Sequence, residues 1–495
     1  MFIVLVNPPT IHRGLAAGAI DDARATEQAQ PYYRSLLTND LRRATNGRST
    51  LPAEHLGLQS LAASLVAAGH DVEIVNGCLE LHTSLVGTLH RIDATAADVI
   101  GFTGPADVFA EVCWLAGALR RAGYDGPLVF GNDLATLAGE RVLESSPHFD
   151  AVVRGEGERT FVELVEHLAG GRPKDAVRGV TFQQVDGAQR TPDQLGVLDL
   201  DVIPRPTRAS RAAIARSMMS ASIFTKRGCH YRCAFCTTGH LASSTGFVGA
   251  RAWRWKRVHA AIDEFRHVAE VYGVDHVTIV DDLFVGRDAA SRDWAAEFAS
   301  ALIEAGNQTT FMIDCRADGV EPELFALLHR AGLRRVFLGV ESASDASLVR
   351  LRKGYRSDVV HRALGILDRL GIDVILGFIF FTPDASLADL DANRRFVAGL
   401  RVPDASLLLQ EVRVYPGTVL ERQLIEDGRL TGAFPCFGGE YQDPRVGAIA
   451  ATVNMQCSGI DEPMRYTFTD RLMREAIADA IAEDTLAPTG DPMTR

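Results

Sequence analysis

The stretch "SIFTKRGCHYRCAFCTTGH" (222–240) decides how the second half of the chain is interpreted, because it holds three of the chain's eight cysteines. Cys229, Cys233 and Cys236 follow the spacing C-x3-C-x2-C, directly after a short apolar run. A structural zinc site needs four ligands, usually as two paired hooks, and no second hook occurs in the sequence. A cubane iron–sulfur cluster is normally capped by four thiolates, so three thiolates leave one iron open to a substrate or cofactor.

Zinc remains an alternative, because His230 or His240 could supply a fourth ligand beside the three cysteines. On that alternative the chain is a zinc-binding module without enzyme activity. The remaining cysteines are scattered, and convergence of Cys315, Cys436 and Cys457 on a second cluster is left open.

The cysteine motif opens a series of strand and helix patterns. The candidate strands are 220–226, 276–282, 309–315, 335–342, 373–381 and 407–414. Helical patterns such as 258–273 and 323–332 separate them. Six such units predict a (β/α)6-type partial barrel, whose working residues stand at the carboxyl ends of the strands.

An earlier series of the same kind occupies the first part of the chain. Its candidate strands are 2–6, 71–75, 98–103, 127–132 and 151–156. Helical patterns at 56–70 and 108–123 alternate with them, which predicts a doubly wound, Rossmann-like parallel sheet in an α/β fold. A ligand of such a sheet lies at the carboxyl ends of its strands.

These patterns divide the chain into four parts. We expect a Rossmann-like domain at 1–170, a linker with a small hairpin at 171–216, the partial barrel at 217–430 and a C-terminal, partly helical region at 431–495. The polar insert 11–50 is a candidate lid.

Composition narrows the possible partners. The formal net charge of −12 argues against a nucleic-acid-binding surface. The longest apolar run, 374–381, falls far short of the roughly 20 residues that a membrane helix needs. The N-terminus has no charged leader, so we expect a cytoplasmic protein, where clustered cysteines bind metals more often than they form disulfides.

The motif "CHYRCAFC" resembles the cluster-binding signature of the radical S-adenosylmethionine (SAM) superfamily, including the aromatic Phe235 before the last cysteine. The resemblance implies a [4Fe–4S] cluster whose open iron chelates SAM. It implies reductive cleavage of SAM to a 5′-deoxyadenosyl radical, which abstracts hydrogen from an unactivated C–H bond. It also implies an electron donor such as flavodoxin or ferredoxin.

Further positions resemble the family more loosely. "VDDLF" holds Asp281 and Asp282, which are candidate catalytic acids, and Asp282 is also a candidate for cofactor binding. Arg316 is a candidate to pair with the SAM carboxylate or with Asp282. "GVES" supplies Gly339, Glu341 and Ser342, which the resemblance places beside SAM.

The front domain resembles the cobalamin-binding domain that precedes many radical SAM enzymes, on the basis of "LVNPP" (5–9) and "RGEGE" (154–158). No D-x-H-x-x-G motif is present to supply a lower cobalt ligand. The chain has Gly131-Asn132 where such domains usually carry Gly-Gly, and a side chain there could obstruct the nucleotide tail of the cofactor. Cobalamin binding is therefore left open.

Two chemistries follow from this choice. With cobalamin, the resemblance implies methyl transfer to carbon or phosphorus. Without cobalamin, it implies radical dehydration, deoxygenation or epimerisation of a sugar or aminocyclitol. The acidic net charge of the chain fits a small-molecule substrate, as in antibiotic biosynthesis, better than it fits tRNA. The sequence does not name the substrate.

Overall fold

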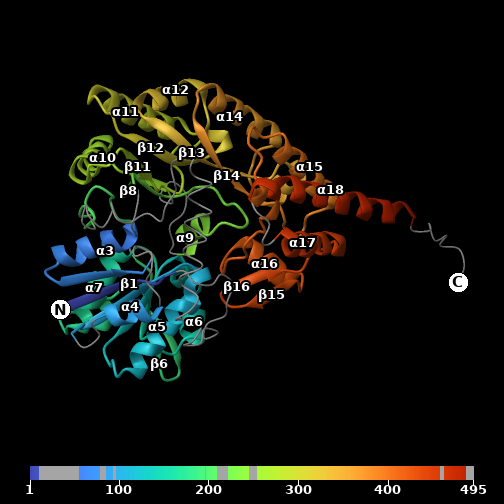
Figure 1. Cartoon of the computed structure of the whole chain (residues 1–495). Coiled ribbons are helices and arrows are strands. Elements are labelled where there is room, and N and C mark those ends of the chain that lie inside the picture. The colour runs from blue at the N-terminus through green and yellow to red at the C-terminus, as the bar shows by residue number, and fades with distance from the viewer. Residues whose placement is uncertain are drawn as a thin grey trace, which may run out of the picture.

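The computed structural model describes residues 1–9, 55–77, 85–92, 96–194, 197–208, 221–244, 253–457 and 462–486. The expected lid at 11–50 lies outside these residues. The described part forms two α/β domains in contact, followed by a C-terminal region that packs at their side (Figure 1).

The front domain is built on a seven-stranded sheet in the order β2-β1-β3-β4-β5-β6-β7. Its first five strands are parallel: β1 (Phe2–Asn7), β2 (Asp71–Asn76), β3 (Val99–Thr103), β4 (Leu128–Gly131) and β5 (Ala151–Val153). All five expected strands of this series are present. The order reverses at β1 and β3, so a crevice is expected at the carboxyl ends of these strands.

Helices cover both faces of this sheet because successive strand side chains point to opposite sides. Val4 and Phe102 pack under α4 (Leu85–Arg91), α5 (Phe109–Arg121) and α6 (Asp133–Ser145). Ile3 and Leu5 pack under α3 (Leu56–Ala67) and α7 (Gly157–Leu168) on the other face. The doubly wound arrangement predicted from the sequence is thus observed.

The hairpin expected in 171–216 is formed by β6 (Val180–Gln184) and β7 (Gly187–Arg190). It does not stand alone in a linker, because β6 pairs antiparallel with β5 and extends the front sheet.

The second domain contains five parallel strands in the order β14-β13-β12-β11-β8. They are β8 (Ala221–Ile223), β11 (His276–Ile279), β12 (Thr310–Arg316), β13 (Leu333–Glu341) and β14 (Asp373–Phe378). A short ribbon of β9 (Lys226–Gly228) and β10 (Trp253–Trp255) lies between this sheet and the front domain.

Helices cover the outer face of the second sheet, away from the front domain (Figure 1). The helices of this domain are α9 (Thr238–Ser244), α10 (Val258–Tyr272), α11 (Ala289–Glu304), α12 (Pro322–Ala331), α13 (Asp345–Arg350), α14 (Ser357–Arg369) and α15 (Leu387–Ala398). The inner face keeps apolar side chains exposed, with Val280 at 41% and Phe337 at 36%. One face of the sheet is therefore left for ligands.

The sixth expected strand, 407–414, is not a strand in the structure. Residues Ala405–Leu409 form a 3-10 helix instead, whose first turn is capped by the Asp404 side chain. A single parallel bridge between Phe381 and Glu411 marks where a sixth strand would continue the barrel.

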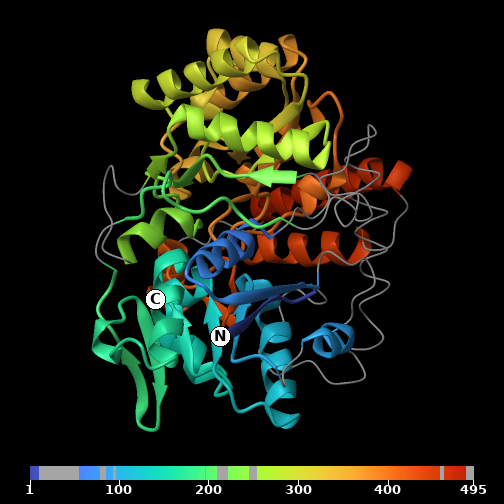
Figure 2. The ribbon, with the colours of Figure 1, turned by 90° about the vertical axis from the view of Figure 1, so that its left-hand side faces the viewer.

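The C-terminal region is more ordered than its sequence indicated. It contains α16 (Val419–Glu426), the hairpin β15 (Leu430–Ala433) and β16 (Cys436–Gly439), α17 (Pro444–Cys457) and α18 (Glu462–Leu486). Its hairpin reaches back to the front domain, where the rings of Phe434 and Phe109 are 6.0 Å apart. Figure 2 shows this region beside both domains. Among the described residues, no helix is both long and apolar enough to cross a membrane.

Candidate active site

A cavity of about 500 Å³ lies where the two domains meet. On the front-domain side it is bounded by residues at the ends of β3, β4 and β5, including Thr103, Gly131 and Gly155. On the barrel side it is bounded by Gly228, Thr238 and Asp282. The cavity therefore joins the crevice of the front sheet to the loop that carries the cysteines.

The three cysteines lie on one loop between β9 and α9. Cys233 is buried, and Cys229 and Cys236 are half-buried. Burial raises the pKa of Cys229 to about 12 and also raises that of Cys236, with smaller contributions from neighbouring cysteines. These thiols are therefore protonated at neutral pH, and binding of iron would displace their protons.

The loop is tightly folded on its own backbone. Ala234 donates its N–H to the carbonyl of Leu351, which ties the loop to the barrel. A Cβ added at Gly239 would lie 2.1 Å from the carbonyl oxygen of Tyr231, so this turn requires glycine. In the described residues, no three His, Cys, Asp or Glu side chains are gathered around the position of one metal ion.

Asp282 anchors both ends of the cysteine loop. One carboxylate oxygen accepts the N–H of Gly228 at 3.0 Å, and the other accepts the hydroxyl of Thr238 at 3.0 Å. Burial raises the pKa of Asp282, while these two hydrogen bonds lower it. Because Asp282 also lines the cavity, it connects the loop to the space where a ligand would lie.

Asp281 faces the protein interior instead. It is 1% exposed, and its oxygens accept the N–H groups of Thr225 and Lys226 at 2.6 and 2.8 Å and the Thr225 hydroxyl. Burial raises its pKa to about 6. The geometry fits a residue that holds the turn between β8 and β9, and it gives no support to the expected catalytic role.

Lys226, which follows that turn, is buried between two aromatic rings. Its ammonium nitrogen lies 4.0 Å from the ring centre of Phe284 and 3.5 Å from that of Trp294. Burial lowers the pKa of the Lys226 ammonium to about 7, and the negative charge of Asp281 acts in the opposite direction by raising it.

Arg316, at the end of β12, pairs with Asp318 and not with Asp282, the acid that the sequence suggested as a partner. The guanidinium donates from Nε and Nη2 to the two carboxylate oxygens at 2.9 and 3.1 Å. The expected contact with the SAM carboxylate stays a prediction.

The "GVES" segment ends β13 in an unusual backbone conformation. Glu341 has φ 67°, a left-handed value that is uncommon for a residue with a side chain. Its carboxylate accepts from the ammonium of Lys353 at 3.1 Å, and a Cβ on Gly339 would lie 3.0 Å from the same carboxylate. Ser342 is buried and donates to Asn393, and its contact with SAM stays a prediction.

Phe235 is not among the residues that line the cavity. It packs with Val414, Leu420 and Leu424, which fastens the cysteine loop to α16 and the segment before it. Whether this ring also contacts a cofactor stays a prediction.

Asn132 does not close the front crevice. Its amide nitrogen donates to the Thr103 hydroxyl at 3.2 Å, and its oxygen accepts the N–H of Asp133 as the cap of α6. At the neighbouring Gly131, an added Cβ would meet Val153 alone within 4 Å, at 3.8 Å. The backbone of Gly131 is thus open to the cavity, and the Asn132 amide is already engaged at its edge.

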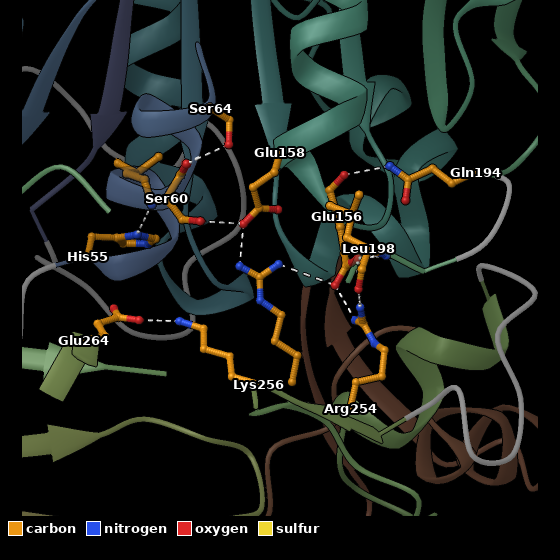
Figure 3. Close-up of polar contacts among 12 residues, drawn as sticks. His55, Ser60, Ser64, Glu156, Glu158, Gln194, Leu198, Arg254, Lys256 and Glu264 are labelled. Carbon is orange, nitrogen blue, oxygen red and sulfur yellow. Dashed lines mark hydrogen bonds and ion pairs between the residues drawn. The ribbon is translucent and has the colours of Figure 1, made fainter. Parts of the chain in front are cut away.

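Ion pairs connect the front domain to the β9–β10 ribbon, whose strand β9 directly precedes the cysteine loop (Figure 3). Glu158 bonds to Arg227 and also accepts from Ser60 at 2.8 Å, while Glu156 bonds to Arg227 and Arg254. The charge of Arg227 lowers the pKa of Glu158, in opposition to burial, which raises it. The "RGEGE" motif therefore serves as the contact between the domains.

His55 lines the cavity at the start of α3 (Figure 3). Its Nδ1 accepts the N–H of Leu58 at 3.2 Å, and burial lowers its pKa to about 4. The ring is therefore neutral at neutral pH, and its Nδ1 caps the first turn of α3.

The sequence reasoning missed three residues of this region: His55, Arg227 and Gly239. Arg227 and Gly239 stand beside the quoted cysteine motif, so their positions were a usable signal. His55 precedes a helical pattern and offered no motif.

The scattered cysteines have separate surroundings. The Cys436 thiol lies 3.5 Å from the Ala106 carbonyl, and Cys457 accepts from Thr469 at 3.1 Å. Cys315 is buried at the end of β12, and burial raises its pKa. These contacts give no support to a second cluster.

Comparison with known families agrees with this geometry. The profile of the radical SAM superfamily matches residues 223–397, and the profile of the B12 binding domain matches residues 42–165. The chain is therefore a radical SAM enzyme with an N-terminal B12-binding domain, as the cysteine spacing and the front strands predicted.

Among curated proteins, the chain is 26% identical to the uncharacterized methyltransferase PH0819 of Pyrococcus horikoshii, over 76% of this chain and 79% of that protein. It is 27% identical to the hopanoid C-3 methylase of Methylococcus capsulatus, over 74% and 68% of the two chains. Among solved structures, it is similar in fold to the cobalamin-dependent SAM radical enzyme OxsB. The TM-score is 0.70 at 17% identity, over 98% of this chain and 75% of OxsB.

The residues present fit the cofactors of these families. Three thiols on one tightly folded loop match a cluster with one uncapped iron. Gly131 at the end of β4 and Gly155 after β5 leave backbone at the cavity wall where a large, flat cofactor can approach. The Asn132 side chain, for which the sequence left obstruction of this approach open, is bonded to Thr103.

Proposed function

We propose that the chain is a cobalamin-dependent radical SAM methyltransferase that acts on a small molecule. The observation that carries this proposal is the shared cavity, because one space is bounded by the glycine ends of the front sheet and by the cysteine-loop anchor Asp282. When bound, the cluster supplies the electron that cleaves SAM, and cobalamin supplies the methyl group that is transferred.

The protein's own residues would hold the cluster and cobalamin in fixed positions relative to each other. Asp282 fixes the cysteine loop at both ends, and Glu156 and Glu158 tie the strand before it to the front domain. A carbon-centred radical needs a site that excludes competing donors and water. Val280 and Phe337 supply apolar surface on the inner face of the barrel sheet.

The net charge of −12 does not favour a nucleic acid. The electron donor is expected to be a small redox protein such as flavodoxin or ferredoxin.

A single-turnover experiment tests this function without knowledge of the substrate. The full chain is reconstituted anaerobically with iron, sulfide and hydroxocobalamin, then reduced and given SAM. We expect S-adenosylhomocysteine in an amount close to that of bound corrinoid, together with 5′-deoxyadenosine. Formation of 5′-deoxyadenosine without S-adenosylhomocysteine would reject methyl transfer and favour dehydration or epimerisation.

A further inference from the structure

The Arg316 side chain reaches the cysteine loop from the end of β12, which lies two strands away from β8 in the barrel sheet. It is 6% exposed, and its Nη1 lies 3.5 Å from the sulfur of Cys233, within hydrogen-bonding distance. Nε and Nη2 donate to Asp318, and Nη2 also donates to the Lys353 carbonyl. The nitrogen that remains, Nη1, is the one directed at the sulfur.

Aromatic contacts fix the plane of this guanidinium. It lies 3.7 Å from the ring centre of Tyr231, which belongs to the cysteine loop, and 5.1 Å from that of Tyr355. A planar, delocalised cation suits such stacking and keeps its donors in a rigid fork, which lysine does not reproduce. Arg316 therefore contacts the loop through both its face and its edge.

An ordinary buried ion pair would not need this arrangement. Asp318 already accepts from Nε and Nη2 of Arg316, and it shares its charge with Arg287 at 3.3 Å. Part of the positive charge of Arg316 is thus left for its remaining contact. That contact is the sulfur of Cys233, one of the three predicted cluster ligands.

We propose that Arg316 raises the reduction potential of the cluster through a charge-assisted N–H···S hydrogen bond to Cys233. Reduction adds one negative charge to the cluster, and a buried cation at a ligand sulfur stabilises the reduced form more than the oxidised form. The cluster is thereby easier to reduce by a donor protein. Arg316 acts here as a positioning and tuning residue. The inference rests on the radical SAM assignment and is independent of methyl transfer.

The test is a redox titration of the reconstituted full-length protein, followed by electron paramagnetic resonance of the reduced cluster. R316Q removes the cation and leaves Asp318 unopposed on that side, so we expect a more negative potential. R316K keeps the charge and loses the fork, so its potential should lie between those of R316Q and the wild type. D318N removes the compensating carboxylate, so its potential should move in the positive direction.

Arg287→Gln is the matched control, because Arg287 also pairs with Asp318 but is 56% exposed. Solvent screens its charge, so a much smaller shift is expected. A loaded R316Q cluster with the wild-type potential overturns the proposal. If the R316Q protein binds no cluster, the D318N protein provides the test. A cluster potential in D318N that equals the wild-type value or is more negative overturns the proposal. A wild-type protein without any cluster would instead refute the radical SAM assignment.

Discussion

The two parallel sheets present contrasting edges to the space between them. The strand ends and loops at the front edge supply Gly131 and Gly155, and the acids beside them, Glu156 and Glu158, are already paired with Arg227. At the barrel edge, Asp282 follows β11 and lines the cavity, and β12 and β13 end in the charged residues Arg316 and Glu341.

This contrast corresponds to two ways of binding a cofactor. Exposed backbone without side chains accommodates a large group by shape, and a Cβ at Gly131 would project into that space. Charged side chains hold a compact, polar group by directed hydrogen bonds, and on this edge they already hold the cysteine loop. The difference indicates that the front sheet binds by shape and the barrel sheet by charge.

The largest effect is expected at the barrel edge. Cys233→Ala removes one of three cluster ligands, so we expect loss of the cluster and complete loss of 5′-deoxyadenosine formation. Iron content and chromatography of the products check this. Cys457→Ala is the control, because Cys457 lies in the C-terminal region against Thr469 and should keep both. SAM cleavage by the C233A protein would break the comparison.

The next effect is expected at the front edge. Gly131→Val places a branched side chain in the cavity wall, where Val153 is within contact at 3.8 Å. We expect corrinoid binding to weaken at least about tenfold, which corresponds to about 1.4 kcal/mol, while cluster content and SAM cleavage remain. Equilibrium dialysis with hydroxocobalamin measures the first quantity. Gly365→Ala, on α14 of the barrel, is the control. Equal losses of cluster and corrinoid in the G131V protein would contradict the inference that the two sheet edges bind separate cofactors.

The ion pairs between the two domains have a pH-dependent contribution. The pKa of Glu158 is held below its ordinary value of 4.5 in the folded protein. Its stabilisation is therefore fully present above pH 4.5 and is lost as the pH falls through the lower, folded-state value. We expect E158Q to lower the free energy of unfolding by about 1.5–3 kcal/mol at neutral pH.

Thermal unfolding of both proteins between pH 3 and pH 7 measures this contribution, and the difference between them should shrink toward acid pH. E163Q is the control, since Glu163 is also on α7 but lies 4.0 Å from its partner Arg172. A difference between wild type and E158Q that is constant with pH contradicts the assignment.

The smallest effect is expected at the position that seemed most adverse in the sequence. Because the Asn132 side chain is bonded to Thr103, Asn132→Gly should change corrinoid affinity by less than about twofold, below about 0.4 kcal/mol. Loss of the cap on α6 should cost only a few tenths of a kcal/mol, roughly, since glycine is tolerated there. Dialysis and denaturant unfolding check both values. Much tighter corrinoid binding by N132G would show that asparagine does obstruct the site.

Local patterns were sufficient for most of the fold. The apolar runs of β1 and β13 and the period of α5 are read from neighbouring residues, and each lies within two residues of its expected place. The segment 407–414 has the same apolar character, but its first part is a 3-10 helix, because the Asp404 cap turns the chain there. Capping competes with strand propensity and is not visible in hydrophobicity alone.

The candidate site was predictable where it is continuous in sequence and poorly predictable elsewhere. The cysteine spacing and the DD pair identified Asp282 and the loop it holds. The choice of Asp318 over Asp282 as the partner of Arg316 depends on the strand end and the following turn. The direction of the Asn132 amide depends on Thr103 from another strand. Such contacts are set by tertiary packing.

One cavity serves both sheet edges, and the corrinoid content of the protein tests this arrangement most directly. The full chain is produced with hydroxocobalamin available, purified anaerobically and assayed for iron, sulfide and corrinoid. We predict one [4Fe–4S] cluster and close to one corrinoid per chain. A protein that holds the intact cluster and cleaves SAM, yet contains no corrinoid and acquires none on incubation, would contradict the account.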